Sequence, residues 1–283
     1  MEHRELGKTG ARISVVGLGG LVVAGMTQQE ANRTVADAIA RGANYFDVAP
    51  TYGNAEELLG PALKGRRDEV FVACKTTERG RDGALAELHQ SLRRLQTDHF
   101  DLYQLHGVRN MAELNQALGA GGAIEVLIDA KARGLARFVG ITTHWTDVAL
   151  QALRQFDFDT VVFPVNFVCW YKAEVGPEVL EVAAKKGTGR IALKSMARGL
   201  WPAGTERVWS KCWYQPIDDP ELAELAVRFT LSQDVSTLIP PGHVELFEMA
   251  LDAADRFRPL QPDETDRLRA IAAVTEPVFE RTP

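Results

Sequence analysis

The chemically most informative residues of the chain are four polar side chains that follow consecutive apolar runs: Asp47, Tyr52, Lys75 and His106. This set suits the reduction of a carbonyl group, in which hydride reaches carbon and negative charge grows on oxygen. The Tyr52 phenol can protonate that oxygen if its pKa falls from about 10, and the Lys75 ammonium would lower that pKa by stabilising the phenolate. Asp47 would keep Lys75 charged and in position. His106 could donate a hydrogen bond to the substrate oxygen.

Each of these residues alone has an ordinary structural interpretation. Asp47 could cap the following helix, and Lys75 could be a solvated lysine at a strand end. Tyr52 could be a packing residue and His106 a core histidine. The chemical interpretation rests on the conjunction of four matching types at the ends of three successive strands, because the carboxyl ends of parallel strands meet at one rim.

Strand-like apolar runs alternate with amphipathic helical patterns through most of the 283 residues. Strands separated by helices pair in parallel, because the helix carries the chain back before the next strand begins. Eight such units, and a length near the roughly 250 residues typical of the fold, predict an α/β protein built as a (β/α)8 TIM barrel. The eight runs are Ile13–Leu18, Asn44–Val48, Val70–Cys74, Asp101–Leu105, Ala136–Ile141, Thr160–Val165, Arg190–Leu193 and Thr237–Ile239.

The helical patterns carry start and stop signals. A helix over 27–41 begins with a capping box, in which Thr27 is followed three residues later by Glu30, and Gly42 ends it. Outside the eight units, residues 4–12 predict an N-terminal β-hairpin and residues 259–283 a C-terminal extra helix. We expect one domain over residues 1–283. The other predicted helices are Asp82–Leu95, Ile124–Arg133, Pro177–Gly187 and Glu221–Ser232.

Two segments between these elements are long, residues 107–123 and 194–217. Both follow a strand, so both are expected at the face where barrel enzymes keep their active sites. Long ordered loops are more often functional than not. The second segment is rich in aromatic residues, which suit either an apolar pocket or ordinary packing.

The residues around the four polar side chains resemble those of the aldo-keto reductase family. Residues 46–56, Phe-Asp-Val-Ala-Pro-Thr-Tyr-Gly-Asn-Ala-Glu, are similar to the family segment in which an Asp is followed five residues later by Tyr-Gly. Residues 5–10 and 15–20 also look like the family's start, and the other two polar residues stand in matching contexts. The resemblance implies an NAD(P)(H)-dependent oxidoreductase that reduces an aldehyde or ketone to an alcohol, with Tyr52 as general acid.

The same resemblance implies a cofactor site in the second half of the chain, where the match is weaker. A Thr-Thr pair stands where the family shows the Ser-Asn that holds the nicotinamide carboxamide, and a Lys-Ser pair replaces a Tyr that stacks on nicotinamide. This lysine could reach the cofactor phosphates. The family most often uses NADPH, so NADP(H) is the expected cofactor and NAD(H) the alternative. The expected cofactor-binding residues are Thr142, Thr143, Asn166, Lys194, Ser195, Gly242 and His243.

His243 is the nearest cation after the eighth strand that could meet the 2′-phosphate of NADPH. Because histidine is weakly basic, we expect a modest preference for NADPH that grows as the pH falls through roughly 6.5.

Composition and charge argue against several other classes. The net charge of −6, with no basic run, is unsuited to nucleic acid or a membrane surface. The longest apolar stretch, residues 13–25, is shorter than the about 20 residues that span a bilayer. The three widely spaced cysteines indicate neither a disulfide framework nor a metal site, and favour the cytoplasm. We expect a small-molecule carbonyl substrate and no metal. The oligomeric state stays open.

Two alternative classes compete with this interpretation. Residues 17–20, Gly-Leu-Gly-Gly, could begin the dinucleotide fingerprint of a Rossmann dehydrogenase, but Val22 stands where its third glycine is required and the next helix starts late. A cofactor-binding regulatory or redox-sensing barrel protein with slow turnover also stays open, because a fold does not fix a function and the cofactor-side residues are altered.

Overall fold

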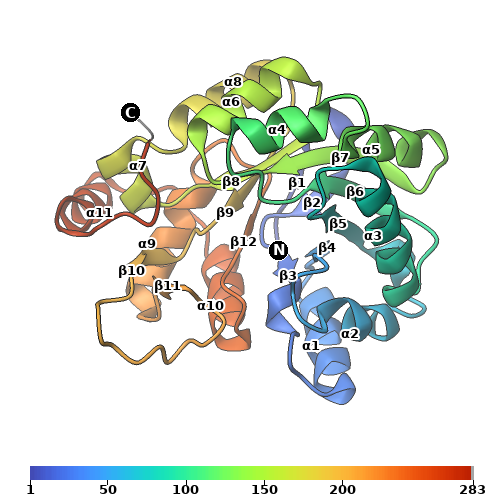
Figure 1. Ribbon diagram of the computed structural model, residues 1–283. Helices are drawn as coiled ribbons and strands as arrows, with labels where there is room; N and C mark the ends of the chain where they lie inside the picture. The colour runs from blue at the N-terminus through green and yellow to red at the C-terminus, as the bar shows by residue number, and fades with distance from the viewer. Residues whose placement is uncertain (282–283) are drawn as a thin grey trace.

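Eight parallel strands form a barrel in the computed structural model, which describes residues 1–281 (Figure 1). Neighbouring strands follow chain order, and a parallel bridge between Val16 and Leu238 joins the first strand to the last. The predicted (β/α)8 class is therefore confirmed. The strands are β3 (Leu18–Gly19), β4 (Tyr45–Asp47), β5 (Phe71–Thr76), β6 (Phe100–Leu105), β7 (Ala136–Thr142), β8 (Thr160–Pro164), β9 (Gly189–Leu193) and β12 (Thr237–Ile239).

Helices surround this barrel and cover its outer face with their apolar sides (Figure 1). The first helix forms as its sequence predicts: Thr27 and Glu30 make the reciprocal capping box, and Gly42 follows the helix with φ of 87°. The helices are α1 (Gln28–Ala40), α2 (Ala55–Ala62), α3 (Arg81–Arg94), α4 (Met111–Leu118), α5 (Ala123–Ala132), α6 (Thr146–Gln155), α7 (Phe167–Ala173), α8 (Pro177–Lys185), α9 (Pro220–Leu231), α10 (Val244–Asp255) and α11 (Pro262–Val274).

The predicted first strand, Ile13–Leu18, is wrong as a single element. Its start belongs to β2 (Arg12–Ser14), which pairs antiparallel with β1 (His3–Glu5), and only its end reaches the barrel in β3. The chain divides here because Leu6 and Ile13 of the hairpin are fully buried against the apolar residues inside the barrel. The hairpin thus covers one end of the barrel.

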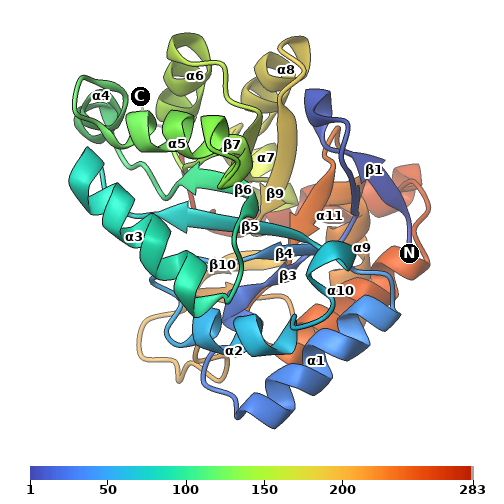
Figure 2. The same ribbon diagram turned by 90° about the vertical axis from the view of Figure 1, so that its right-hand side faces the viewer.

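Both long segments lie at the opposite end of the barrel from the hairpin, and both contain secondary structure. Residues 107–123 include α4, whose first turn is capped by the Asn110 side chain accepting from the Glu113 backbone at 2.9 Å. Residues 194–217 include β10 (Ala197–Leu200) and β11 (Tyr214–Pro216), which pair antiparallel. Figure 2 shows the N-terminal hairpin and this β10–β11 excursion at opposite ends of the barrel. The open end of the barrel therefore carries the carboxyl ends of the strands and the aromatic-rich residues 194–217.

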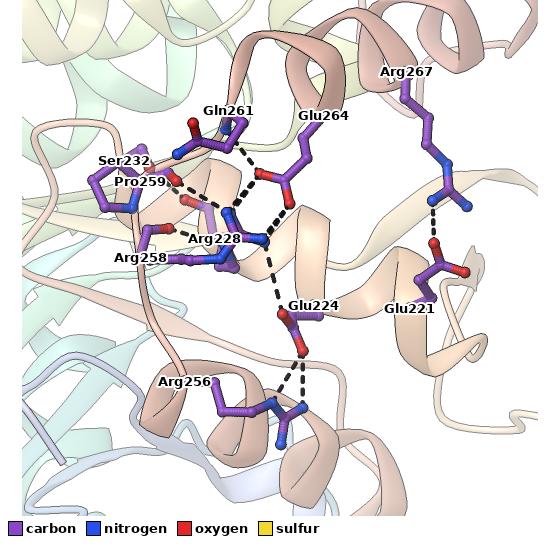
Figure 3. Close-up of polar contacts among 10 residues, drawn as sticks. All are labelled: Glu221, Glu224, Arg228, Ser232, Arg256, Arg258, Pro259, Gln261, Glu264 and Arg267. Atoms are coloured by element: carbon purple, nitrogen blue, oxygen red, sulfur yellow. Dashed lines mark hydrogen bonds and ion pairs between the residues drawn. The ribbon is translucent and has the colours of Figure 1, made fainter.

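The C-terminal helix is held by a buried arginine (Figure 3). Arg228 on α9 is 1% exposed and donates hydrogen bonds to Glu264 of α11 at 2.6 and 2.9 Å. It also donates to the carbonyl oxygens of Arg258 and Pro259, at 2.9 and 3.1 Å. Burying a guanidinium is tolerated only when its donors are satisfied, as they are here. The predicted C-terminal helix is thus present and fixed against α9.

The chain after α11 returns to the open end of the barrel. Lys172 of α7 donates to the Thr275 carbonyl at 2.9 Å, and Phe279 stacks on His144 with ring centroids 4.7 Å apart. The N-terminal and C-terminal additions thus serve opposite ends of the barrel. Within residues 1–281, no helix has both the length and the apolar character that crossing a membrane requires.

Candidate active site

The four polar residues singled out first come together at the carboxyl ends of the strands. Asp47 is the last residue of β4, Lys75 is the penultimate residue of β5, and His106 directly follows β6. Tyr52 lies in the turn between β4 and α2. All four line one cavity of about 340 Å³ at the mouth of the barrel.

Asp47 and Lys75 form a buried ion pair, and each is 2% exposed. The Lys75 ammonium also donates to the Val48 carbonyl at 3.2 Å. The second Asp47 oxygen accepts from the Tyr45 hydroxyl at 3.3 Å and lies 3.5 Å from the Gln104 amide nitrogen. Burial opposes the charge on Lys75, but Asp47 and the Tyr52 oxygen outweigh it and raise the Lys75 pKa. The site therefore holds a fixed ammonium.

Tyr52 lies beside this ammonium, with Lys75 Nζ 5.1 Å from the ring centroid. Burial raises the Tyr52 pKa, Lys75 lowers it in part, and Asp47 opposes Lys75. The expected fall in the pKa is therefore not found, because burial outweighs the ammonium. The phenol stays protonated at neutral pH and can act as a proton donor, while Lys75 is placed to stabilise the phenolate that forms.

His106 packs edge-on against Tyr52, with ring centroids 5.7 Å apart. Burial, then Lys75 and other cations, lower its pKa well below the usual value, so the imidazole is neutral and offers one N–H. Its backbone is held by Arg79, which donates to the carbonyls of His106 and Gly107 at 2.8 and 3.2 Å. Arg79 in turn pairs with Glu113 at 2.9 Å. Sequence reasoning missed Arg79, because it supports His106 through backbone carbonyls, which leave no signal in the sequence.

Three of the seven expected cofactor residues line the same cavity: Thr142, Lys194 and Gly242. Thr143 does not, because its hydroxyl donates to the Val108 carbonyl at 2.7 Å and is fully buried. Asn166 is also fully buried, and its side-chain oxygen caps α7 by accepting from the Cys169 backbone at 2.9 Å. Ser195 is fully buried as well.

Two of these buried residues still have unused polar atoms. Within residues 1–281, Asn166 Nδ2 and Ser195 Oγ have no hydrogen-bond partner. The two residues follow the adjacent strands β8 and β9. Buried polar groups without partners are rare and call for a ligand or water. An amide donor and a hydroxyl fit a carboxamide, so the residues present are compatible with a nicotinamide group.

His243 does not line the cavity. Its Nε2 accepts a hydrogen bond from the Lys211 backbone at 3.1 Å, which requires that nitrogen to be unprotonated. Burial and Lys211 also lower the His243 pKa. Lys211 does line the cavity, and its ammonium donates to the carbonyls of Leu21 and Val22 at 3.0 and 3.1 Å. Lys211, rather than His243, is therefore the cation available at this end of the site.

The cavity has further lining residues that were not chosen from the sequence: His144, Lys211, Trp213 and Tyr214. The aromatic pair belongs to the segment whose length and composition marked it as functional, but single residues could not be selected there. His144 carried a signal, because it follows β7 closely, as His106 follows β6. In the part of the chain described, no group of three or more His, Cys, Asp or Glu side chains could hold a metal ion.

Comparison with known proteins agrees with this architecture. The Aldo/keto reductase family model matches residues 15–211. The L-galactose dehydrogenase of Arabidopsis thaliana is 28% identical over 313 aligned residues, which cover 100% of this chain and 97% of that protein. The uncharacterized oxidoreductase YqkF of Bacillus subtilis is 33% identical over 57% of this chain and 55% of its own.

Solved structures give the same result for the fold. The holo form of an aldo-keto reductase from Bacillus halodurans aligns over 100% of both chains, with a TM-score of 0.76 and 23% identity. A putative aldo-keto reductase from Pseudomonas aeruginosa aligns over 89% of this chain and 94% of its own, with a TM-score of 0.72 and 25% identity. The chain therefore belongs to the aldo/keto reductase family, a family of carbonyl-reducing oxidoreductases that bind nicotinamide cofactors.

Proposed function

We propose that this protein reduces an aldehyde or ketone to an alcohol with hydride from NADPH, and that Tyr52 is the proton donor. The observation that carries the proposal is the position of the Tyr52 phenol beside the buried Asp47–Lys75 ion pair in a cavity at the barrel mouth. Nearby opposite charge stabilises a phenolate, so the proton can leave Tyr52 when an oxygen of sufficient basicity is presented to it.

The steps follow from the protonation states of the lining groups. The reduced nicotinamide, when bound, supplies the hydride that reaches the carbonyl carbon. The neutral His106 donates its N–H to the carbonyl oxygen and orients it, and Tyr52 transfers its phenolic proton to that oxygen as charge grows there. Lys75 stabilises the resulting phenolate, and Asp47 keeps Lys75 charged and in place. The four residues thus divide orientation, proton transfer and charge stabilisation among them.

We further propose that NADPH is preferred over NADH through Lys211. Lys211 borders both the main cavity and a second hollow, which is lined also by Arg33 of α1 and Val244 at the start of α10. A 2′-phosphate in that hollow would meet two cations. Glu30 also lines this hollow, but its carboxylate accepts a hydrogen bond from the Thr27 backbone in the capping box of α1. Charge-assisted contacts of this kind favour the phosphorylated cofactor.

The reaction direction and the substrate are open to a direct assay. The name of the Arabidopsis relative describes sugar oxidation, so an aldose is one substrate to test beside aromatic and aliphatic aldehydes. The experiment measures turnover of NADPH and NADH with a panel of carbonyl compounds, and of the oxidised cofactors with aldoses. Bound cofactor that is not turned over by any compound would favour the alternative of a regulatory or redox-sensing barrel.

We also propose that the protein works in the cytoplasm. The three cysteines Cys74, Cys169 and Cys212 are buried and unpaired. Free thiols persist in a reducing compartment, whereas secreted proteins more often pair them. Cell fractionation with an antibody to the protein tests this assignment.

A further inference from the structure

One lysine in the cavity has no role in the mechanism described above. Lys194 follows β9, four strands from β5 in the eight-stranded sheet, and therefore lies across the barrel mouth from Lys75. Its ammonium lies 4.6 Å from the ring centroid of Tyr214 and 5.3 Å from that of Trp213. Lys75 has a carboxylate partner, but within residues 1–281 Lys194 forms no ion pair and its ammonium donates no hydrogen bond.

The position of Lys194 is costly in two ways. Its backbone has φ of 64°, in the left-handed region that L-residues other than glycine seldom adopt. Burial of its ammonium, with no carboxylate nearby, lowers the Lys194 pKa to about 8. Strained backbone and unpaired buried charge tend to persist at functional sites, where a ligand makes use of them.

The charge of the cavity points to the kind of ligand. The charged side chains that line it are Asp47, Lys75, Lys194 and Lys211. Asp47 and Lys75 neutralise each other, and Lys211 donates to two backbone carbonyls. The cavity therefore carries excess positive charge in a chain whose net charge is −6, and Lys194 is the ammonium left without an acceptor. A negatively charged ligand group would satisfy it.

We propose that Lys194 binds a carboxylate of the substrate, so that the preferred substrates are carbonyl compounds that also bear an anionic group. The inference rests on the proposed function for the reaction itself. Two sources of an oxyanion exist, the substrate and the cofactor phosphates. The substrate is favoured because Lys194 lines the same cavity as His106 and His144, and its charge contributes to lowering the pKa values of both histidines. The rings of Trp213 and Tyr214, over which the ammonium lies, add apolar surface for the uncharged part of such a substrate.

The test is a binding measurement that needs no turnover. Benzoate and benzamide have nearly the same shape but differ in charge, and each is titrated by calorimetry into the protein saturated with NADPH. We expect benzoate to bind about ten-fold more tightly than benzamide, the scale of one charge-assisted contact. Lys194→Met should remove this difference, and Lys194→Arg should keep most of it. Lys185→Met, which removes an exposed lysine of α8, is the matched control and should behave as the parent protein.

A pH series gives a second readout. The titratable groups facing Lys194 are Tyr214, Cys212, His106 and His144. Burial raises the pKa values of Tyr214 and Cys212 and lowers those of the two histidines. These groups are therefore uncharged around neutral pH, and Lys194 changes charge near pH 8. The preference for benzoate should be greatest below that pH and fade above it.

Three outcomes would overturn the inference. Equal binding of the two ligands by the parent protein is one, and an unchanged preference in a folded Lys194→Met protein is another. The third is that Lys194→Met weakens NADPH binding ten-fold while leaving the benzoate preference intact, which would assign the lysine to a cofactor phosphate. A protein that shows the benzoate preference but reduces no carbonyl compound would instead contradict the proposed function alone.

Discussion

At the scale of single residues, the convergence of the four candidate catalytic residues on one cavity was the most predictable feature of the site. Asp47, Tyr52, Lys75 and His106 could be selected because strand ends converge in a parallel barrel and because their types suit one reaction. Protonation states could not be predicted, because burial decides them: the Tyr52 pKa rises where sequence reasoning expected a fall. The roles of the buried residues expected to bind the cofactor could not be predicted either. A sequence does not distinguish an asparagine that caps a helix, as Asn166 does, from one that binds a ligand.

Lys75→Met should suppress turnover by about 10²-fold or more, the scale of losing an effective proton donor. Without the ammonium the Tyr52 pKa rises further, because Lys75 is the group that lowers it. The alkaline limb of the pH–rate profile should therefore move to higher pH. Removing one partner of a buried pair also costs about 3–5 kcal/mol, so denaturant unfolding must accompany the assay. A folded variant with an unmoved profile would contradict the coupling of Lys75 to Tyr52.

His106→Ala should lower the rate at saturation by about 10²-fold while leaving the cofactor dissociation constant nearly unchanged, because the proposed partner of His106 is the substrate oxygen. The His106 pKa lies well below its usual value, so the imidazole is already neutral near pH 6. The parent rate should then show no step near pH 6.5, the ordinary histidine value. Such a step, lost in the variant, would mean that His106 titrates and that its neutral form is wrongly assigned.

At the scale of elements, alternation of strands and helices was sufficient to predict the barrel, but local departures were not predictable. The run over 13–18 divides between the hairpin and β3 because of a tertiary contact, the burial of Leu6 and Ile13 inside the barrel. The short helix α4 carries apolar residues at helical spacing, Met111, Leu114 and Leu118, but its 8 residues lie inside a segment that was predicted only as a long loop. The division of 13–18 arises where packing with distant segments outweighs the local pattern, whereas the local pattern of α4 is present but short.

The attachment of α11 gives a stability prediction. Glu264→Gln removes the main carboxylate partner of Arg228, which is 1% exposed, and should destabilise the fold by about 3 kcal/mol. Glu221→Gln is the matched control, because its partner Arg267 is half-exposed and such pairs contribute under about 1 kcal/mol. Equal unfolding midpoints for the two variants in urea would show that the buried arginine does not anchor the helix.

The same network has a pH dependence of known sign. Hydrogen bonds from Arg228 hold the Glu264 pKa well below its usual range. A carboxylate with a lowered folded-state pKa contributes stability above its unfolded value of about 4.3 and loses it as the pH falls through the folded value. The difference in unfolding free energy between the parent protein and Glu264→Gln should therefore be full at pH 7 and shrink in acid. A difference that grows in acid would contradict the assignment.

At the scale of the whole molecule, the mouth of the barrel is formed by the two long segments and by the chain after α11. They surround a site whose residues follow the carboxyl ends of the strands. The cation proposed to meet the cofactor phosphate illustrates what this assembly adds. From the sequence His243 was the nearest candidate, but the β10–β11 excursion brings Lys211 beside Leu21 and leaves His243 as a hydrogen-bond acceptor. A contact between residues 190 positions apart is set by the closed barrel and has no local signal.

Lys211→Met should weaken NADPH binding about ten-fold and change NADH binding little, because only NADPH carries the 2′-phosphate. The measurement is the ratio of the two dissociation constants by fluorescence titration at pH 6 and pH 8. The His243 pKa is lowered and its Nε2 already accepts a hydrogen bond. His243 should therefore cause little change in the ratio of the two dissociation constants of the parent protein between these pH values. Loss of affinity for both cofactors alike would place Lys211 elsewhere on the cofactor.

The central claim, that Tyr52 donates the proton in a nicotinamide-dependent carbonyl reduction, is tested most directly by single-turnover stopped-flow measurement. Protein saturated with NADPH is mixed with a reactive aldehyde, and the absorbance of the reduced nicotinamide is followed for the parent protein and for Tyr52→Phe. We expect Tyr52→Phe to bind NADPH with unchanged affinity but to oxidise it at least about 10²-fold more slowly. A Tyr52→Phe protein that retains more than about half of the parent rate would contradict it.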